Sequence, residues 1–364
     1  MDPENKEVTV LDHKSGITFH KPYDELLIST GASPITPDFM KSPPKNVFIL
    51  REISDGEAIK EALEKNSVRD VVVVGGGYIG LEMVEAFYDQ GKNVTLINRS
   101  GKIMKTYDGE IREVLMNELE EKGIHLYLDD EVEEMIPDDE GMIKQVKTNR
   151  DVYNADLVVV AIGIRPSTEF VKDIGLEMLD NGAIITDRQM KTSLDNIYAA
   201  GDCASVYHRL LKKPVYIPLA THANKQGRIL AEILAGKDKF YPGALGTSVV
   251  RVMDITLSQT GLSLKECKDA GLNFQSVFIK TPNKAGYYPD NNPVYIKYLF
   301  DKDSKVLLGA QMAGKEGVAH RINSLAVAID QGMTLEEIAL SDFAYAPPFS
   351  GTWDATQVAA NVGN

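Results

Sequence analysis

The segment Gly75-Gly76-Gly77-Tyr78-Ile79-Gly80 has the glycine spacing of a loop that binds a dinucleotide. It follows an apolar strand and opens a helical pattern, which is the context that the motif requires. Gly75 allows the tight turn, Gly77 allows the backbone to approach a pyrophosphate, and Gly80 allows close packing of helix on strand. The amide groups at the helix N-terminus then face the anion. A purely structural turn does not explain glycine at all these offsets, so we predict that this loop, with Ile79 in it, binds a cofactor.

The residues that select between NADH and NADPH lie about twenty positions after such a loop, at the end of the next strand. An NADH site usually has a carboxylate there, which accepts hydrogen bonds from the ribose, whereas this sequence has Asn98. Arg99 can form a bidentate pair with a 2′-phosphate, and Lys105 can reach the same phosphate. Asn98, Arg99 and Lys105 therefore favour NADPH over NADH. The alternative interpretation is that Arg99 and Lys105 are solvated surface cations.

Small residues after two other strands indicate where the chain leaves one nucleotide-binding domain for the next. These segments are Ser29-Thr30-Gly31-Ala32 and residues 161–166, which include Gly163. A third signature, Gly201-Asp202, puts a carboxylate at the end of a strand, where it can accept a hydrogen bond from a polyol such as the flavin ribityl chain. Each string is weak alone, but their order along one chain is specific.

Alternating strands and helices must position these loops. Between residues 52 and 166 the hydrophobic pattern predicts a complete, doubly wound α/β domain that binds NAD(P). The remaining boundaries give an incomplete domain at 1–51 that continues at 167–240, and a separate α+β domain at 241–364. Among the predicted elements are helices over 55–66, 109–122 and 222–235, and strands over 94–97, 156–164 and 183–187.

Composition excludes several classes of function for this chain. A net charge of −14 over 364 residues argues against a nucleic-acid surface, which needs a basic face. The longest apolar run, residues 157–164, is too short to span a membrane, and the N-terminus is polar. We therefore expect a cytoplasmic protein that has neither nucleic acid nor membrane as a partner.

Cysteine and histidine usage predicts no metal site. Cys203 and Cys267 are the two cysteines, a count that suits a reducing compartment. We expect Cys203 to be a small buried residue and Cys267 to face the surface of a helix, and neither to be a redox nucleophile. The six histidines are scattered without metal-ligand spacing, so they are predicted to be structural.

The order of these motifs resembles the pyridine nucleotide–disulfide oxidoreductases, which bind FAD and NAD(P)H and dimerise through a C-terminal domain. Gly286-Tyr287-Tyr288-Pro289 and the segment 343–350 are similar to the coenzyme A disulfide reductase branch. The resemblance implies that residues 1–51 and 167–240 bind FAD and that 241–364 forms a homodimer. It also implies that Tyr345 and one of Tyr287 and Tyr288 approach the active cysteine of a partner subunit, that Tyr78 gates the nicotinamide pocket and that Glu82 lies near the flavin. Plain packing of the tyrosines at an interface is the alternative.

The sequence departs from this family at its N-terminus. A full member begins with a glycine-rich FAD-binding unit and a redox cysteine, and neither is found here. The resemblance implies reduction of coenzyme A disulfide or a related small disulfide. The alternatives are an NADH oxidase, a persulfide or polysulfide reductase, or a non-catalytic NAD(P)-binding dimer. We expect these 364 residues alone to bind NADP(H), to retain little or no FAD and not to reduce coenzyme A disulfide.

Replacing Arg99 by alanine should weaken NADPH binding by about 1–3 kcal/mol, the scale of a hydrogen bond to a charged group. NADH binding should hardly change, because NADH has no 2′-phosphate. Calorimetric titration of both nucleotides measures the difference, and equal losses for the two would contradict the assignment.

Overall fold

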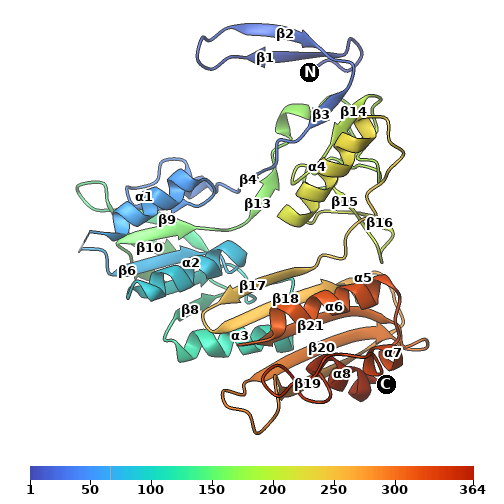
Figure 1. Ribbon diagram of the computed structural model, residues 1–364. Helices are drawn as coiled ribbons and strands as arrows, with labels where there is room; N and C mark the ends of the chain where they lie inside the picture. Colours follow the sequence, from blue (N-terminus) through green and yellow to red (C-terminus); the bar gives the residue numbers. More distant parts are fainter. Residues whose placement is uncertain (66) are drawn as a thin grey trace. The chain divides into compact units, whose positions relative to one another are not determined.

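The computed structural model describes residues 1–65 and 67–364, which divide into two compact units. One unit combines Met1–Ser33 with Ile164–Ala244, and the other combines Pro34–Gly163 with Leu245–Asn364. Each unit is thus built from two stretches that are far apart in the sequence (Figure 1). Within these residues, no helix is long and apolar enough to cross a membrane.

A five-stranded parallel sheet organises residues 34–163. Its order is β5-β12-β6-β7-β8, so the chain builds outward from β6 to β7 and β8 and then returns to place β12 on the other side of β6. Doubly wound sheets bind ligands outside the carboxyl ends of the strands at such a switch point. The strands are β5 (Val47–Ile49), β6 (Asp70–Val74), β7 (Asn93–Asn98), β8 (His125–Leu128) and β12 (Leu157–Val160).

The strands of this sheet are buried on both faces, as parallel strands usually are. Val71 and Val73 belong to one hydrophobic cluster, whereas Val72 and Val74 belong to another on the opposite face. The helices that connect the strands are α1 (Ile53–Leu63), α2 (Tyr78–Asp89) and α3 (Gly109–Glu121). Helix α1 corresponds to the predicted helix 55–66, although Asn66 lies outside the described residues.

An antiparallel meander between β8 and β12 covers the second face of the parallel sheet. Its strands are β9 (Val132–Pro137), β10 (Ile143–Thr148) and β11 (Val152–Asn154), in the order β11-β10-β9. Met135, Ile143 and Val146 pack in the same cluster as Val72 and Val74. The short 3₁₀ helix η1 (Asp38–Met40) contributes Met40 to this cluster. The face that carries Val71 and Val73 is left for the helices.

The C-terminal part of this unit is a five-stranded antiparallel sheet with the order β17-β18-β21-β20-β19. Figure 1 shows this sheet and its helices in orange and red. The strands are β17 (Ser248–Val252), β18 (Ile255–Gly261), β19 (Phe274–Pro282), β20 (Pro293–Asp301) and β21 (Leu307–Gly314). The helices are α5 (Leu264–Asp269), α6 (Val318–Asp330), α7 (Leu335–Ala339) and α8 (Ala355–Gly363).

The two faces of this antiparallel sheet meet different partners, because alternate side chains point to opposite faces. Ser258 and Tyr298 hydrogen bond to backbone oxygens of α6 and α8, at Val318 and Thr356. The opposite face meets the nucleotide-binding domain. There Gln311 accepts a hydrogen bond from the backbone N–H of Asp108, just before α3.

A buried lysine strengthens this second contact. Lys297 on β20 is 1% exposed, and its Nζ lies 3.3 Å from Asp108 Oδ2 and 2.7 Å from Glu110 Oε2. Burial alone would raise the pKa of Glu110, but the hydrogen bond from Lys297 brings it below its usual value. Val250 and Leu257 of the C-terminal sheet also share one hydrophobic cluster with the α2 side of the parallel sheet. The two domains therefore fold as one unit.

The other unit contains short two-stranded pairings and one long helix. Strands β1 and β2 form an antiparallel hairpin, and β3 pairs in parallel with β14. The elements are β1 (Glu7–Leu11), β2 (Thr18–Pro22), β3 (Leu26–Ile28), β4 (Ala32–Pro34), β13 (Ile164–Pro166), η2 (Glu169–Val171), β14 (Ile197–Ala199), β15 (Val206–His208), β16 (Lys213–Val215) and α4 (Ala220–Leu234).

Most of the predicted architecture is confirmed: α/β nucleotide-binding domains are followed by an α+β domain. Two details differ. Strand β5 belongs to the parallel sheet of the nucleotide-binding domain, whereas the sequence analysis placed its residues in the domain that begins with residues 1–51. The predicted strand 183–187 is wrong. Ile184 makes only isolated bridges, to Met178 on one side and Ala204 on the other, so the segment is extended but joins no continuous ladder.

Replacing Lys297 by methionine should lower the free energy of unfolding by about 3–5 kcal/mol, because Asp108 would stay buried without its cation. The matched control is Lys122→Met, since Lys122 pairs with Asp254 at 2.9 Å in a partly exposed position. Its loss should cost at most about 1 kcal/mol. Urea denaturation followed by circular dichroism compares the two variants, and equal midpoints would contradict the structural role of Lys297.

Candidate functional site

The glycine loop lies at the switch point of the parallel sheet, and backbone contacts explain two of its glycines. Gly75 has a positive φ of +112°, and a Cβ there would lie 2.4 Å from the carbonyl oxygen of Ala161, which follows β12. A Cβ on Gly80 would lie 1.9 Å from the carbonyl oxygen of Gly75. Both positions therefore require glycine. These contacts place the start of α2 directly against the end of β6.

Gly77 differs, because a Cβ there would have no neighbour within 4 Å. Gly77 is the N-cap of α2, and because glycine has no side chain, it gives no side-chain cap to the first backbone N–H groups of this helix. Open space in front of free helix amides is a fitting cradle for a pyrophosphate. The residues present thus fit a dinucleotide.

Asn98 shapes the glycine loop through its side chain. Its Oδ1 accepts a hydrogen bond from the backbone N–H of Gly76 at 3.0 Å, and its Nδ2 donates to the carbonyl oxygen of Ser100 at 2.6 Å. The backbone N–H of Met104 donates to the carbonyl oxygen of Gly76 at 2.7 Å. The segment that contains Arg99 is therefore fastened to the loop.

The two predicted cations beside this loop are both exposed. Arg99 Nη1 lies 3.4 Å from Glu131 Oε1, in an ion pair with high solvent exposure. Such pairs contribute little free energy, so the guanidinium can exchange Glu131 for a phosphate. No local pattern indicates that Glu131, thirty-two residues later, is the partner of Arg99.

Tyr78 and Glu82, both on α2, lie in different surroundings. The Tyr78 hydroxyl is 3.1 Å from Ser248 Oγ and accepts a hydrogen bond from Gln259 Nε2 at 3.3 Å, so it reaches the C-terminal sheet of its own unit. The Glu82 residue as a whole is exposed, but neighbouring protein atoms partly bury its carboxyl group. This partial burial raises the pKa of the carboxyl group, and the nearby charge of Glu85 raises it further. A carboxyl with a raised pKa is a feature of functional sites, although it also occurs in structural clusters.

In the other unit, Thr30 and Gly31 are fixed to the returning chain. The Thr30 hydroxyl donates to the carbonyl oxygen of Ser167 at 2.7 Å, and the backbone N–H of Ser167 donates to the carbonyl oxygen of Gly31 at 2.9 Å. Gly31 has a φ of +67° and Gly163 a φ of +121°. These positive angles explain why small residues mark the two crossovers.

Asp202 follows β14, as the sequence predicted. The preceding Gly201 has a φ of +81°, and its backbone N–H donates to Gln226 Oε1 at 2.9 Å. Partial burial raises the pKa of the Asp202 carboxyl group. Among the described residues it forms no ion pair, and a partly buried carboxylate benefits from a hydroxyl donor, so Asp202 fits the polyol of a flavin.

Two loops bring the predicted tyrosines together. Tyr287 and Tyr288 lie between β19 and β20, and Tyr345 lies before α8. A hydrogen bond with Tyr345 raises the pKa of the Tyr287 phenol. Tyr288 lies beside Lys284, whose Nζ is 5.9 Å from its ring centre. Tyr287 is 78% exposed, so the pair faces the surface of this chain.

Neither cysteine has the surroundings of a nucleophile. Cys203 is buried, as predicted, but the prediction that Cys267 faces the surface is wrong, because this side chain is 0% exposed. Helix α5 is short, and it turns Cys267 inward. Burial raises the pKa of the Cys267 thiol to about 12, so it stays protonated.

His222 is buried with Nδ1 2.9 Å from the Tyr241 hydroxyl, and burial lowers its pKa to about 4.

Arg321 and Asp354 were missed by the sequence analysis, although they connect both tyrosine loops. Arg321 lies on the buried stripe of α6, three residues after Val318 and four before Leu325. A charged residue in an apolar stripe indicates a buried partner, and this was the available signal.

Within the described part of the chain, no group of three or more His, Cys, Asp or Glu side chains could hold a metal ion.

Two known protein families match nearly the whole chain. Residues 1–227 match the family described as Pyridine nucleotide-disulphide oxidoreductase, and residues 247–356 match its dimerisation domain. The second match covers the antiparallel sheet, helices α5 to α7 and both tyrosine loops.

Curated relatives are similar over most of their length. An NAD(P)H sulfur oxidoreductase (CoA-dependent) of Pyrococcus furiosus is 40% identical over 341 residues, which is 93% of this chain and 76% of the relative. A coenzyme A disulfide reductase of Staphylococcus aureus is 32% identical over 96% of this chain and 78% of the relative.

Solved structures confirm the fold. A reduced Bacillus anthracis CoADR-RHD has a TM-score of 0.92 and 34% identity, and it covers 99% of this chain. An engineered water-forming NADPH oxidase bound to NADPH also has a TM-score of 0.92, with 31% identity over all of this chain and 80% of that one. The chain spans 65% of the length of the Bacillus anthracis protein.

Gly77→Ala and Gly80→Ala should separate binding from folding. A methyl group at Gly77 enters open space, so stability should stay the same, but NADPH and NADH should both bind at least about tenfold more weakly, or about 1.4 kcal/mol. Gly80→Ala collides with backbone and should destabilise the fold. Thermal unfolding and nucleotide titration test both variants. Unchanged affinity in a folded Gly77→Ala protein would contradict the cradle.

Proposed function

The chain belongs to the pyridine nucleotide–disulphide oxidoreductase family, and from this premise we propose that it takes part in NADPH-dependent reduction of coenzyme A disulfide or a related small disulfide. The observation that carries the proposal is the uncapped N-terminus of α2 at the switch point of the parallel sheet, with Arg99 on the adjoining segment. Members of this family use FAD and NAD(P)H.

The nucleotide-binding residues of this chain have separate tasks. The backbone amides after Gly77 would bind the pyrophosphate, and the close packing of Gly80 holds these amides in place. Arg99 and Lys105 would bind the 2′-phosphate, while Asn98 keeps their segment against the loop. Tyr78 lies at the start of the same helix and would cover the nicotinamide.

A preference for NADPH is supported by an engineered relative. The NADPH oxidase differs from its NADH oxidase parent by five substitutions, and in one run of three the sequence Asp-Ala-Met becomes Ala-Arg-Ser. The present chain has Asn98-Arg99-Ser100 after β7, with no carboxylate and with arginine and serine in the same order. The physical reason is the same, because a 2′-phosphate needs a cation in place of an anion.

Thr30, Gly31, Gly201 and Asp202, all in the unit of Met1–Ser33 and Ile164–Ala244, are the residues that we assign to the flavin. Asp202 fits a ribityl hydroxyl because its carboxyl group is partly buried and forms no ion pair among the described residues. When bound, FAD supplies a carrier that accepts hydride from the nicotinamide and delivers electrons to the acceptor. The protein contributes orientation and exclusion of water.

The paired tyrosines would serve the acceptor. Reduction of one disulfide consumes two electrons and two protons and yields two thiols. A tyrosine phenol, with an ordinary pKa of about 10, is protonated at neutral pH, and the hydrogen bond with Tyr345 raises the pKa of Tyr287 further. A protonated phenol can donate a hydrogen bond to a departing thiolate sulfur. Tyr288, which lies beside Lys284, is the second candidate from the same loop.

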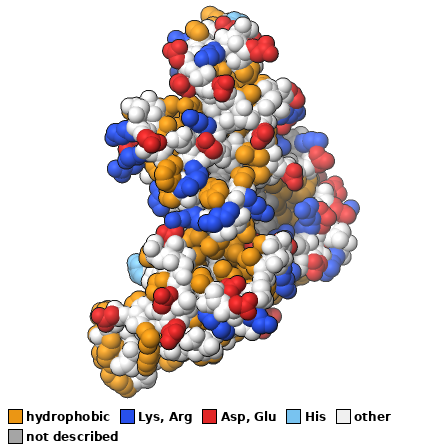
Figure 2. Space-filling model, turned by 90° about the vertical axis from the view of Figure 1, so that its right-hand side faces the viewer, with side chains coloured by type: hydrophobic (Ala, Val, Ile, Leu, Met, Phe, Trp, Pro, Cys, Tyr) orange, Lys and Arg blue, Asp and Glu red, His pale blue; other side chains and the backbone are white. Residues whose placement is uncertain are grey.

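A homodimer would provide the partner for these tyrosines. The dimerisation domain has large hydrophobic side chains at its surface, including Tyr287, Leu340, Phe349 and Trp353. Figure 2 shows hydrophobic side chains reaching the surface in the lower part of the view, which holds the C-terminal sheet and its helices. Burial of such side chains between two copies is the usual solution for an apolar surface.

A sulfur-reducing function is the second candidate, and it is favoured by the Pyrococcus furiosus relative. An oxidase function is the third, because the engineered relative and its parent are named water-forming oxidases. All three use the same nucleotide site and differ in the electron acceptor. The acceptor therefore has to be identified by its products.

Measuring products in a flavin-loaded protein that also carries the redox cysteine of a full family member distinguishes these functions. We expect its NADPH oxidation without oxygen to depend on coenzyme A disulfide and to release two thiols per NADPH, whereas residues 1–364 alone should not reduce the disulfide. Sulfide release from polysulfide at a higher rate would favour the second candidate. Consumption of one oxygen molecule per two NADPH in the absence of disulfide, the stoichiometry of a water-forming oxidase, would contradict the proposed acceptor.

A further inference from the structure

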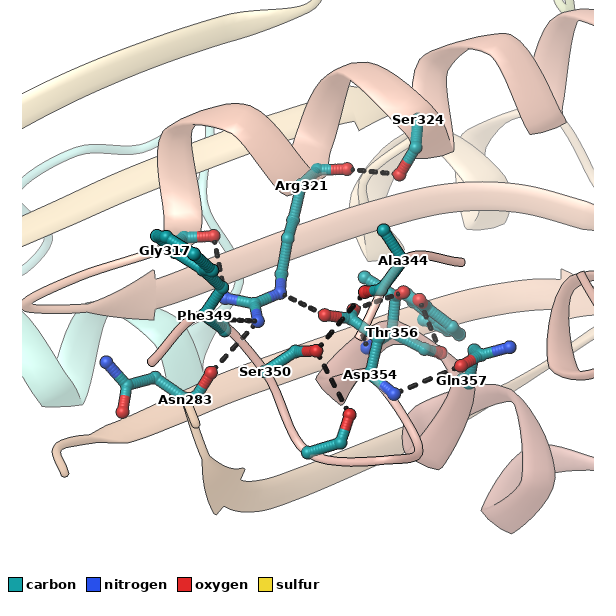
Figure 3. Close-up of polar contacts among 12 residues, drawn as sticks. Asn283, Gly317, Arg321, Ser324, Ala344, Phe349, Ser350, Asp354, Thr356 and Gln357 are labelled. Carbon is teal, nitrogen blue, oxygen red and sulfur yellow. Dashed lines mark hydrogen bonds and ion pairs between the residues drawn. The ribbon is translucent and has the colours of Figure 1, made fainter. Parts of the chain in front are cut away.

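Arg321, in the first turn of α6, uses its whole guanidinium group within the C-terminal domain (Figure 3). Its Nε donates to Asp354 Oδ2 at 2.8 Å, and its Nη1 donates to the carbonyl oxygen of Gly317 at 3.1 Å. Its Nη2 donates to two further carbonyl oxygens, at 3.0 Å to Asn283 and at 3.2 Å to Phe349. The side chain is largely buried, with 11% exposed.

The two carbonyls on Nη2 belong to the two loops that carry the tyrosines. Asn283 lies four residues before Tyr287, and Phe349 lies four residues after Tyr345. One nitrogen atom thus joins the base of one loop to the base of the other. The loops also meet directly, because the backbone N–H of Ala285 donates to the carbonyl oxygen of Pro347 at 3.4 Å.

Asp354 fixes the direction of the guanidinium. It is the N-cap of α8, where Oδ1 accepts hydrogen bonds from the backbone N–H of Thr356 at 3.0 Å and from its hydroxyl at 2.7 Å. Its other oxygen holds Arg321 Nε. The planar fork of arginine therefore presents Nη2 to both loops at a set angle, which a lysine ammonium cannot reproduce.

We propose that Arg321 is a positioning residue, which, with Asp354, holds the Tyr287 and Tyr345 loops together so that the two phenols meet. This inference rests on the proposed role of the tyrosines in the reaction. Arg321 itself does not contact either phenol in the described structure, so it acts through the backbone of the two loops.

Lys284, in the same loop as Tyr287, has a partner of its own. Lys284 pairs with Glu316 at 3.1 Å, and Asn283 Nδ2 donates to the same Glu316 oxygen at 3.1 Å. This second set of contacts orients the Tyr287 loop alone. Arg321 differs because its contacts reach both loops.

The test is a ¹³C NMR titration of tyrosines labelled at Cζ, with Tyr287 and Tyr345 assigned from Tyr287→Phe and Tyr345→Phe. In the wild-type protein Tyr287 should titrate above the ordinary value of about 10. In Arg321→Lys, which keeps the charge but not the fork, the Tyr287 midpoint should shift down toward that value. The matched control is Ser324→Ala, because the Ser324 hydroxyl donates to the carbonyl oxygen of Arg321 at 2.7 Å but reaches neither loop. The control should leave the midpoint unchanged.

A folded Arg321→Lys protein with a lower melting temperature but an unchanged Tyr287 midpoint would overturn the proposal, since a merely structural role gives that result. If Arg321→Lys does not fold, the Tyr287 midpoint is measured in Asp354→Asn instead, because asparagine keeps the N-cap of α8 but loses the charge that pairs with Arg321. The same shift supports the proposal, and an unchanged midpoint overturns it.

Turnover separates this inference from the proposed function. In a flavin-loaded protein that also carries the redox cysteine of a full family member, Arg321→Lys should lower kcat for the disulfide to the value of Tyr345→Phe, and the double variant should lose no more. Full activity in both phenylalanine variants would refute the tyrosine role in the reaction, whereas the titration would still decide whether Arg321 holds the pair.

Discussion

The contact between Gly80 and the carbonyl of Gly75 is the constraint on which the nucleotide site depends. A single methyl group on Gly80 would lie 1.9 Å from that oxygen. Because the two residues touch, α2 starts immediately after β6, and its first amides point beyond the carboxyl edge of the sheet. Gly75 touches the segment after β12 in the same way, so the loop is held at the switch point from both sides. Gly77 alone remains open, and it is the position that a pyrophosphate needs.

A second set of contacts connects this site to the domain that carries the tyrosines. Lys297 is buried between Asp108 and Glu110, and one hydrophobic cluster runs from the parallel sheet into the antiparallel one. Tyr78 makes the same connection from the glycine loop, through Ser248 and Gln259. The nucleotide-binding domain and the C-terminal domain are therefore one folding unit. A substitution on the face of the antiparallel sheet that contacts α3 is therefore expected to alter the position of the start of α2.

Local sequence predicted the parts of the site that depend on backbone geometry. The glycine offsets, the crossovers at Gly31 and Gly163, and the carboxylate Asp202 after a strand could all be found, since each reflects a rule about one short segment. Contacts between distant segments could not be found. The pairing of Arg99 with Glu131 and the bridge from Arg321 to two loops depend on tertiary packing. Residues 183–187 looked like a strand and Cys267 looked exposed for the same reason, because burial and pairing are decided by neighbours that the local pattern does not contain.

The central claim is that the N-terminus of α2 and the segment from Asn98 to Lys105 together bind NADP(H). A crystal structure of the protein soaked with NADP⁺ tests it most directly. The account predicts pyrophosphate density against the backbone of Gly77 and Tyr78, with the 2′-phosphate within hydrogen-bond distance of Arg99 in place of Glu131. A nucleotide bound away from Gly77, or one whose 2′-phosphate lies in solvent while Arg99 stays paired with Glu131, would contradict it.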